Sequence, residues 1–532
     1  MKKTLLALSV WGLALNACAT STDNTPSTHT SKTSSAQQRC TALSQTQLDD
    51  TRITQVQWTD GVIGSDKMAA LTGGSAAQQK AQPHCIVEGE IGARIGADGK
   101  HYGTQFQLRL PENWNGKFLF QGGGGVNGFV APAVGNIPIR SSTATPALMR
   151  GYAVVSMDGG HPKPHPDFGA DQQARLDFAY QSIGKVTHIA KKLIAQNYDK
   201  QPEHNYFMGC SNGGREAMMA MQRYPLEFDG IIAANPGFRL SRAAVAQVWD
   251  THHLMKIAPK SVLTNALTQQ DLDKVSEAVA QQCDAQDGLK DGIINQWESC
   301  RFNPASVLPK AKANVLKAIF DGAKTRDGQA IYSGWYYDTG INTTDWRRWK
   351  LGSSQDPAKP DARNVTLGFG SLVWYFMSPA NPNFDVSRFD FDRDTPKVFQ
   401  TGAINDAIST DLTTFKARGG KFIMVTGVSD PVFSAKDQVD WFKQLRADNP
   451  NSESFVQMFM VPGMTHCGNG KAMDDFDPLT ALENWHTTNR TPEQLLAKGK
   501  TFPGRSMPLC AYPKSAFYMG GDEHQANSFV CK

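Results

Sequence analysis

A serine and a histidine that lie far apart in this chain each stand directly beside a cysteine. Ser211 is the third residue of GCSNG, residues 209–213, which fits the G-x-S-x-G pattern of a sharp turn between a strand and a helix. His466 is followed by Cys467, just as Ser211 is preceded by Cys210. A serine becomes a nucleophile when a histidine within hydrogen-bonding reach takes its proton. If Cys210 and Cys467 form a disulfide, that bond ties the nucleophile to the base from adjacent positions.

Asp430 has the position expected of a third catalytic residue. It follows an apolar, strand-like run at residues 421–426 and comes between the serine and the histidine, which is the order of an α/β-hydrolase triad. There its carboxylate would orient the imidazole and stabilise the imidazole cation. On position alone, an aspartate that begins a turn or a helix is the alternative interpretation. Asp437 and Asp440, which lie in an expected helix, are weaker candidates.

Four consecutive glycines, residues 122–125, follow another short apolar run at residues 117–121. They lack the Gly-Lys-Ser/Thr ending of a phosphate-binding loop. In a hydrolase, a loop at this place supplies one backbone N–H of the oxyanion hole, and the residue after the nucleophile, here Asn212, supplies the second. A flexible turn is the alternative interpretation of the glycines.

Three aspartates, Asp284, Asp287 and Asp291, lie close together in one loop. Hard oxygen ligands at short spacing suit calcium. The spacing is not that of an EF-hand and no glutamate closes the loop, so a solvated turn fits the residues equally well. Cys283 and Cys300 flank the loop and could close it with a disulfide.

Alternating strand and helix patterns surround these residues. Strand–helix–strand order predicts a parallel sheet. We therefore expect an α/β fold: an α/β-hydrolase core with a mostly parallel sheet and helices on both faces. The expected strands span residues 105–110, 117–121, 152–157, 205–208, 230–234, 421–426 and 456–461, and the expected helices span residues 183–197 and 214–224.

The alternation stops between about residues 238 and 399, in a segment rich in Trp, Asn, Asp and Gly. We interpret residues 238–399 as a large lid domain inserted into the core. The two parts of the core are then residues 40–237 and 400–532. A length of 532 residues, more than a single domain usually holds, agrees with an insertion.

The first 17 residues have the pattern of a secretory signal peptide. Lys2 and Lys3 precede an apolar stretch, residues 5–15, which is too short to span a membrane. The sequence LNAC, ending at Cys18, resembles a bacterial lipoprotein cleavage box and predicts a lipid on Cys18, with plain secretion as the alternative. Residues 18–39, rich in Ser, Thr and Gln, predict a disordered tether. We expect an exported protein, either secreted or held as a lipoprotein in the bacterial periplasm or outer membrane.

The composition is that of an ordinary globular protein, with 40% hydrophobic and 20% charged residues. The formal net charge of +4 includes the two lysines of the leader, and no basic run with interleaved aromatic residues predicts a nucleic-acid partner. Apart from Cys18, the chain has an even number of cysteines, which suits an oxidising compartment, although the sequence alone does not fix their pairing. The spacings of the cysteines do not indicate a zinc site. We expect no organic cofactor, and the sequence leaves the oligomeric state open.

Taken together, these features resemble the tannase and feruloyl esterase family. A Cys-Ser … Asp … His-Cys arrangement is characteristic of that family, and the similarity also covers PENWNG at residues 111–116, residues 209–216 and 283–293, and VPGM at residues 461–464. The resemblance implies a triad of Ser211, His466 and Asp430 and an oxyanion hole formed by the N–H groups of Gly125 and Asn212. It also implies aromatic contacts to the substrate from three lid or loop residues. These are Trp349, Phe369 and Phe433.

The same resemblance implies a structural calcium ion and the pairing of eight cysteines. The calcium ligands would be the side chains of Asp284, Asp287 and Asp291 and the carbonyl groups of Leu289 and Ile293. The implied disulfides are Cys210–Cys467, Cys40–Cys85, Cys283–Cys300 and Cys510–Cys531.

One departure concerns the substrate. Family members that hydrolyse terephthalate monoesters carry a lid arginine for the free carboxylate, and this chain has Val365 there, with Arg363 two places away. Two further lid contacts become Gly370 and Val373. We therefore expect a serine carboxylic-ester hydrolase of aromatic, feruloyl- or galloyl-type esters. The alternatives are a terephthalate-monoester hydrolase, a non-catalytic ligand-binding lipoprotein and a serine peptidase with a similar core.

Overall fold

A nine-stranded sheet forms the centre of the computed structural model, which describes residues 35–63 and 79–532. The predicted signal peptide and Cys18 lie outside the described residues. The strand order is β1-β4-β5-β7-β6-β8-β9-β10-β11. The strands are β1 (Thr51–Thr59), β4 (His84–Ile95), β5 (His101–Pro111), β6 (Lys117–Gln121), β7 (Ala153–Met157), β8 (His204–Cys210), β9 (Gly230–Ala234), β10 (Lys421–Gly427) and β11 (Val456–Val461).

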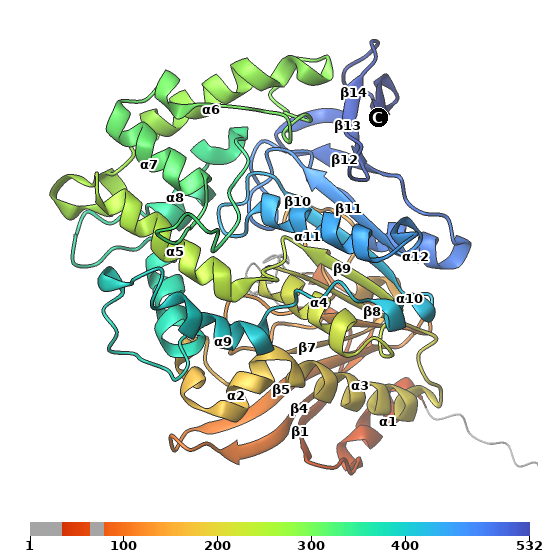
Figure 1. Ribbon diagram of the computed structural model, residues 1–532. Coiled ribbons are helices and arrows are strands. Elements are labelled where there is room, and N and C mark those ends of the chain that lie inside the picture. Colours follow the sequence, from red (N-terminus) through yellow and green to blue (C-terminus); the bar gives the residue numbers. More distant parts are fainter. Residues whose placement is uncertain (1–34, 64–78) are drawn as a thin grey trace, which may run out of the picture. The chain divides into compact units, whose positions relative to one another are not determined.

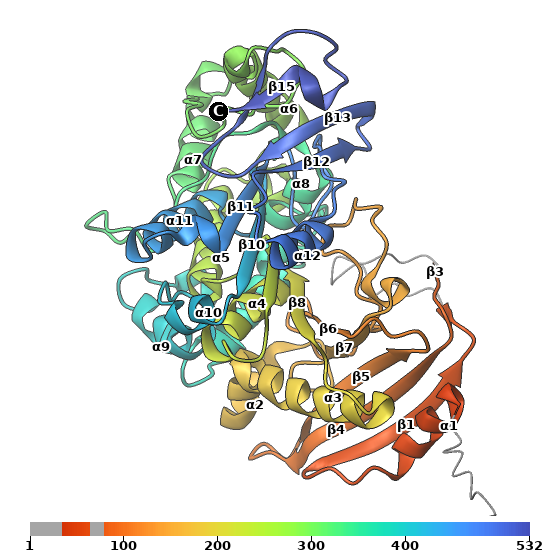
Figure 2. The same ribbon diagram turned by 90° about the vertical axis from the view of Figure 1, so that its right-hand side faces the viewer.

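The sheet is mixed but mostly parallel, as expected. Strands β7, β6, β8, β9, β10 and β11 pair in parallel, whereas β1, β4, β5 and β7 pair antiparallel. Figure 2 shows β1, β4 and β5 at one edge, beside the short helix α1 (Ala36–Ala42). All seven predicted strands are present, and only Tyr152, at the start of the predicted strand 152–157, lies outside its element.

Helices cover both faces of the parallel part of the sheet. Successive side chains of a strand point to opposite faces, so a strand that is apolar throughout needs a helix on each face to bury it. Phe207 of β8 packs in one core with residues of α3, α4 and α11, whereas its neighbours Tyr206 and Met208 pack in the other core with α12. The prediction of a core with helices on both faces is therefore confirmed. These helices are α3 (Ser182–Tyr198), α4 (Asn212–Arg223), α11 (Ala435–Asp448) and α12 (Pro478–Thr488), and α2 (Gln172–Leu176) precedes α3.

The chain between β9 and β10 contributes no strand to the nine-stranded sheet and is mainly helical. Figure 1 shows α5 to α8, coloured yellow-green to teal, grouped on one side of β8 to β11. The bounds of the lid domain, residues 238–399, stay a prediction. The helices of this segment are α5 (Leu240–Met255), α6 (Gln269–Cys283), α7 (Lys310–Phe320), α8 (Thr344–Lys350), α9 (Thr395–Asn405) and α10 (Thr413–Ala417).

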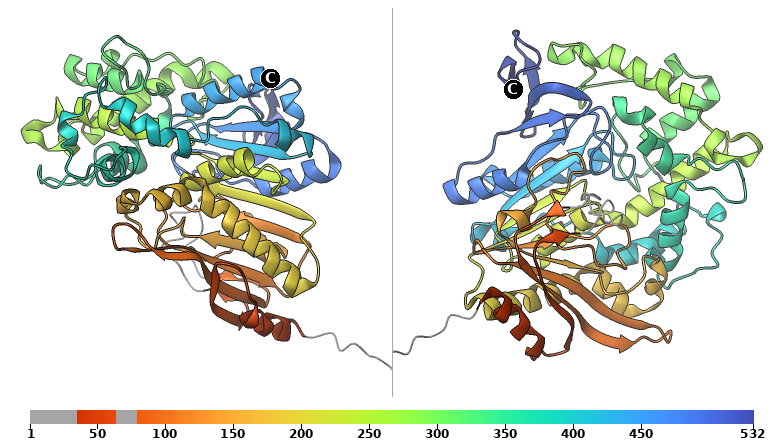
Figure 3. Two further views of the ribbon diagram at one scale, coloured as in Figure 1. Left: turned by 60° about the horizontal axis from the view of Figure 1, so that its bottom comes forward. Right: turned by 180° about the vertical axis from the view of Figure 1, so that it is seen from behind.

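The C-terminal segment forms two small antiparallel sheets of its own. Figure 3 shows it in dark blue, near the green end of α6, and the two segments approach where the Tyr518 carbonyl lies above Gly288. Its strands are β12 (Gln494–Gly499), β13 (Phe502–Cys510), β14 (Ala516–Tyr518) and β15 (Phe529–Cys531); β2 (Val62–Ile63) and β3 (Gln79–Lys80) form a further small pair.

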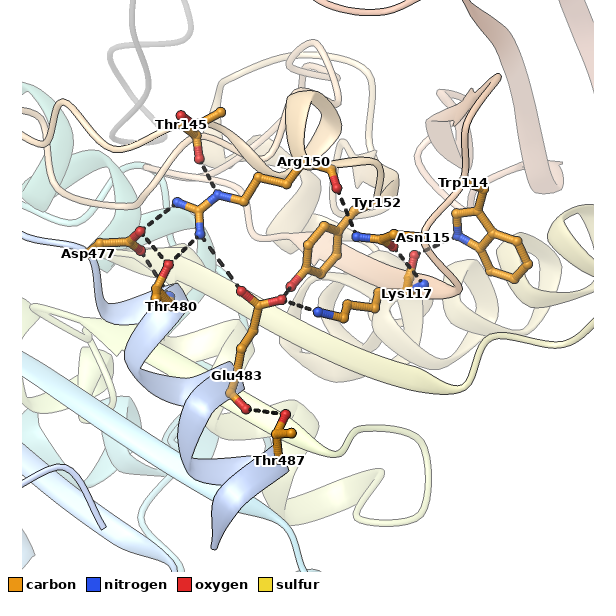
Figure 4. A network of polar contacts seen from close by, with 10 residues as sticks. All are labelled: Trp114, Asn115, Lys117, Thr145, Arg150, Tyr152, Asp477, Thr480, Glu483 and Thr487. Atoms are coloured by element: carbon orange, nitrogen blue, oxygen red, sulfur yellow. Dashed lines mark hydrogen bonds and ion pairs between the residues drawn. The ribbon is translucent and has the colours of Figure 1, made fainter. Parts of the chain in front are cut away.

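A polar network joins the two parts of the core (Figure 4). Glu483 of α12 accepts hydrogen bonds from Lys117 of β6 and from the Tyr152 hydroxyl. Arg150 donates to Asp477 at the start of α12 at 2.8 Å. Burial and the Glu483 carboxylate raise the pKa of Tyr152, so the phenol stays a neutral donor. This network holds α12 against the early strands.

The first described residues differ from the prediction. Residues 18–39 were expected to form a disordered tether, but α1 already begins at Ala36. The reason is a tertiary contact: Cys40 of α1 is buried and bonded to Cys85 of β4, and this bond holds a short polar helix that would be marginal alone. Among the described residues, no helix is long and apolar enough to cross a membrane.

Candidate active site

Ser211 stands between the end of β8 and the start of α4, in a strained backbone conformation with φ 63° and ψ −125°. The turn requires small neighbours. A Cβ on Gly209 would lie 2.5 Å from the Gly213 backbone, and one on Gly213 would lie 2.4 Å from the Gly123 carbonyl oxygen. The glycines therefore let β8, α4 and the glycine loop meet closely, with the serine at the point of the turn.

His466 links Ser211 to Asp430. Its Nε2 lies 2.9 Å from Ser211 Oγ, and its Nδ1 lies 2.9 Å from Asp430 Oδ2. With the proton on Nδ1, the imidazole donates to the carboxylate and accepts from the serine hydroxyl. The structure thus brings together the three residues that the sequence predicted as a triad.

Asp430 is held as a hydrogen-bond acceptor on both oxygens. Its Oδ1 accepts the backbone N–H groups of Val432 at 2.7 Å and Phe433 at 3.2 Å. Its Oδ2 also accepts from Asn235 at 2.7 Å. Asn235 follows β9 and was not found from the sequence, because nothing near it in the chain indicates a partner 195 positions away.

The predicted disulfide between Cys210 and Cys467 is present, with the two Cα atoms 6.0 Å apart. It connects the strand that ends at Ser211 to the loop that carries His466, so nucleophile and base are covalently fixed on adjacent residues. The other three predicted disulfides are confirmed as well: Cys40–Cys85, Cys283–Cys300 and Cys510–Cys531. Four disulfides are typical of a protein that folds outside the cytoplasm.

A buried carboxylate supports the loop that would form the oxyanion hole. Gly125, with φ +58°, and Asn212 both line the cavity at Ser211. Glu216, one turn along α4, accepts from the Gly123 N–H at 2.7 Å, from Asn127 Nδ2 at 2.8 Å and from Asn212 Nδ2 at 3.1 Å. Burial raises the pKa of Glu216. Sequence reasoning missed this residue, although an acid on the buried face of the helix after the nucleophile was a usable signal.

Arg215 fixes the other end of the Asn212 side chain. It is fully buried and donates from Nε to Asn212 Oδ1 at 2.7 Å. Its remaining guanidinium N–H groups donate to the carbonyl oxygens of Ala179, Phe178 and Asn405. Asn212 is therefore held by a donor and by an acceptor, and its backbone N–H cannot shift easily.

An aromatic cavity opens onto Ser211. The ring centroids of Trp349 and Phe433 lie 5.9 Å and 5.4 Å from that of His466. The predicted Phe369 does not line this cavity: the π-helical turn Asn364–Phe369 directs Leu367 and Gly368 into it and leaves Phe369 half-buried beside it. The cavity is lined by Gly125, Val126, Phe178, Ser211, Asn212, Leu240, Ala244, Gln247, Trp349, Leu367, Gly368, Ser371, Tyr375, Phe376, Val432 and Phe433.

Asp338, between β9 and β10, connects the two loops that carry Asp430 and His466 through hydrogen bonds. Its Oδ2 accepts from the Ser429 hydroxyl and from the Gly463 N–H, each at 2.7 Å. Asp338 is buried, and burial raises the pKa of its carboxyl. Ser429 directly precedes Asp430, so one carboxylate from the inserted segment connects both triad loops. No sequence signal pointed to it.

The predicted calcium loop lies between α6 and the C-terminal strands. Asp284 accepts from the Gly292 N–H, and Asp287 accepts from the Leu289 N–H at 3.1 Å. Asp291 accepts from the Ile293 N–H at 2.9 Å and forms an ion pair with Arg505. Among the described residues, no three His, Cys, Asp or Glu side chains form a group that could hold a metal ion.

The carboxylates of this loop nevertheless have the chemistry that calcium prefers. Burial raises the pKa of Asp287 to about 6 and raises that of Asp284, and the charge of Asp291 adds to both shifts. The Arg505 guanidinium compensates the charge of Asp291, whereas Asp284 and Asp287 form no ion pair among the described residues. Hard oxygen donors such as these carboxylates suit Ca²⁺. The donor set fits the ion, although Asp291 here pairs with Arg505.

Residues 85–532 match the family model described as "Tannase and feruloyl esterase". The chain belongs to this family, and it is a carboxylic ester hydrolase with an α/β-hydrolase fold.

Known proteins of the family resemble the chain over most of its length. It is 36% identical to a mono(2-hydroxyethyl) terephthalate hydrolase of Piscinibacter sakaiensis, over 89% of this chain and 87% of that protein. It is 26% identical to a probable feruloyl esterase of Arthroderma benhamiae, over 80% and 81%. Among solved structures, feruloyl esterase B from Aspergillus oryzae superposes with a TM-score of 0.78 at 21% identity, over 94% of this chain and 100% of that one. This structural match supports the fold alone.

Proposed function

We propose that the enzyme hydrolyses esters of aromatic, phenolic acids of the feruloyl or galloyl type through an acyl-enzyme on Ser211. The observation that carries this proposal is the hydrogen-bonded chain Ser211–His466–Asp430 at the wall of an aromatic cavity. Ring faces and edges such as those of Trp349 and Phe433 favour an aromatic acyl group.

In the proposed mechanism, His466 takes the proton of Ser211 as the serine oxygen attacks the ester carbonyl. The developing oxyanion accepts hydrogen bonds from the N–H groups of Gly125 and Asn212. His466 then protonates the departing alcohol, and Asp430 stabilises the imidazole cation. Water, activated by the same histidine, releases the acid and regenerates Ser211.

Ser211→Ala tests the proposal on a panel of purified esters such as methyl ferulate and methyl gallate. We expect kcat to fall by at least about 10³-fold, since the covalent step is lost. Near-wild-type turnover by the variant would exclude Ser211 as the nucleophile. Amides of the same acids separate an esterase from a peptidase, and we expect the wild type to cleave only the esters.

A second candidate substrate is a terephthalate monoester. The Arg363 guanidinium lies 5.4 Å from the Trp349 ring, next to the cavity, and burial and the nearby charges of Arg348 and Arg140 lower the pKa of Arg363. A carboxylate on the far end of the acyl ring would relieve this concentration of positive charge. The relative from Piscinibacter sakaiensis is named for this activity. Arg363→Gln should lower kcat/KM for mono(2-hydroxyethyl) terephthalate and leave methyl ferulate unchanged; equal losses would argue against a carboxylate site.

We also propose that calcium stabilises the loop formed by residues 283–293. The side chains of Asp284, Asp287 and Asp291 and the carbonyl groups of Leu289 and Ile293 would hold it, and the ion would supply the missing positive charge. A chelator should lower the melting temperature, and added Ca²⁺ should restore it. No bound metal by elemental analysis and no shift on chelation would remove calcium from the account.

We also propose that the enzyme is exported and that a lipid is attached to Cys18. A lipid on Cys18 would hold the enzyme at a bacterial membrane, with the residues after it as a tether. Cys18→Ser should release the protein from the membrane fraction without changing the activity. Unchanged fractionation, with no lipid found by mass spectrometry, would leave plain secretion.

A further inference from the structure

One face of α5 contributes a polar side chain to the acyl cavity. Leu240, Ala244 and Gln247 line the cavity and follow one another at spacings of four and three, so they lie on the same face of the helix. The first two are apolar, as expected of a wall that receives an aromatic ring. Gln247, at the end of this row, presents an amide to the same space.

The Gln247 amide has no hydrogen-bond partner in the described part of the chain, although the residue is only 7% exposed. Other polar side chains of the cavity are already bonded: the Ser371 hydroxyl donates to the Leu367 carbonyl at 2.8 Å, and the Tyr375 hydroxyl donates to Asn405 at 3.1 Å. The Gln247 amide is not among the fully buried polar atoms that lack a partner, so its unbonded atoms open onto the cavity, where a polar group of a ligand can reach them. A ligand group that covered the amide without bonding it would leave it unsatisfied, which is costly.

Gly368 makes room for this amide. A Cβ at residue 368 would lie 2.1 Å from Gln247 Oε1, so any other residue there would push the amide away. Gly368 itself lines the cavity, from the π-helical turn opposite α5. The amide therefore occupies a defined position between two elements.

We propose that Gln247 is a specificity residue that recognises a hydroxyl group on the aromatic ring of the acyl group. This inference rests on the proposed function. An amide offers one acceptor and two donors, which complement the O–H donor and the oxygen acceptor of a phenol. A carboxylate would use only the donors and would be repelled by Oε1. Gln247 thus favours phenolic acids, whereas Arg363 would favour a second carboxylate.

The test compares two esters that differ by one hydroxyl, methyl 4-hydroxycinnamate and methyl cinnamate. The wild type should have the higher kcat/KM for the hydroxylated ester. Gln247→Met, which keeps the length of the side chain but removes the amide, should lower kcat/KM for that ester about five- to tenfold and leave methyl cinnamate within about twofold. Gly368→Ala, which displaces the amide, should cause the same selective loss. Gln222→Met is the matched control, because Gln222 of α4 is a half-buried glutamine outside the cavity, and this variant should not change the ratio.

The ratio of the two kcat/KM values decides whether Gln247 recognises the ring hydroxyl. If Gln247→Met lowers both rates equally, or neither, the inference is wrong and Gln247 is only a packing residue. If Gln247→Met fails to fold, as judged by its melting curve, the Gly368→Ala ratio decides instead, and an unchanged ratio overturns the inference. If the wild type cleaves neither ester, the proposed function fails and this inference fails with it.

Discussion

Glu216 provides a sharp test of how the oxyanion loop is held. Its Oε2 accepts the Gly123 N–H, and its Oε1 accepts the side chains of Asn127 and Asn212. Glu216→Gln keeps the shape but changes one oxygen into a donor. In the better of its two orientations, the amide oxygen still accepts the hydrogen bonds from Asn127 and Asn212. The amide NH₂ group, which is a donor, then faces the Gly123 N–H, which is also a donor. One buried backbone donor is left without an acceptor.

Such an unsatisfied buried group costs about 1–3 kcal/mol. If the glycine loop moves to relieve this cost, the Gly125 N–H leaves the oxyanion, and about 2 kcal/mol of lost transition-state stabilisation lowers kcat roughly 30-fold. KM should change little, because the oxyanion forms only in the transition state. The assay is steady-state hydrolysis of an aromatic ester, with melting curves measured in parallel.

Asp394→Asn is the matched control. Asp394 is fully buried and hydrogen-bonded to Asp390, Arg393 and Lys397, away from the cavity residues. It should lower the melting temperature with kcat intact. If Glu216→Gln behaves like this control, losing stability but no kcat, Glu216 does not position the oxyanion loop and the reasoning is refuted.

Three further predictions concern the supports of the triad and the pH dependence of stability. Asp338→Ala removes the acceptor shared by Ser429 and Gly463, so kcat should fall about tenfold at nearly constant KM, with partial rescue by Asp338→Asn; a change in KM alone would contradict this. Cys210→Ala/Cys467→Ala should lower kcat and the melting temperature, whereas Cys510→Ala/Cys531→Ala should lower only the latter; full activity of the first variant would make the disulfide incidental to catalysis. Burial raises the pKa of Asp437 to about 7 in the folded state. Between about pH 4 and pH 7 the folded protein therefore keeps a proton on Asp437 that the unfolded chain has released, so the free energy of unfolding falls as the pH rises through this range. Asp437→Asn should therefore raise the melting temperature at pH 8 relative to the wild type more than at pH 4.5, and an equal difference at both pH values would be inconsistent with this titration.

The triad could be predicted because its signals are local. A glycine-flanked serine after an apolar run, an acid after a strand and a histidine in a loop each depend on a few neighbouring residues. The supports of the triad lack such signals. Glu216 contacts Gly123 across 93 positions and Asp338 contacts Gly463 across 125, so only the folded chain reveals them.

Two features of the structure that the sequence did not indicate have physical causes of the same kind. The contact of Phe369 with the substrate stays a prediction, and the π-helical turn determines that Leu367 and Gly368 of residues 364–369 line the cavity. The tether was expected to reach residue 39, but a disulfide at Cys40 orders a helix whose composition is polar. In both cases a tertiary constraint, rather than local propensity, determines the structure.

The central claim is that Ser211 carries the acyl group during ester hydrolysis. The most direct measurement is mass spectrometry of enzyme quenched in acid during turnover of 4-nitrophenyl ferulate. We predict a feruloyl adduct on Ser211 in the wild type, increased in a His466→Ala variant loaded slowly with the same ester, because deacylation then lacks its base. Continued turnover with no adduct on Ser211, or with the adduct on another residue, would contradict the account.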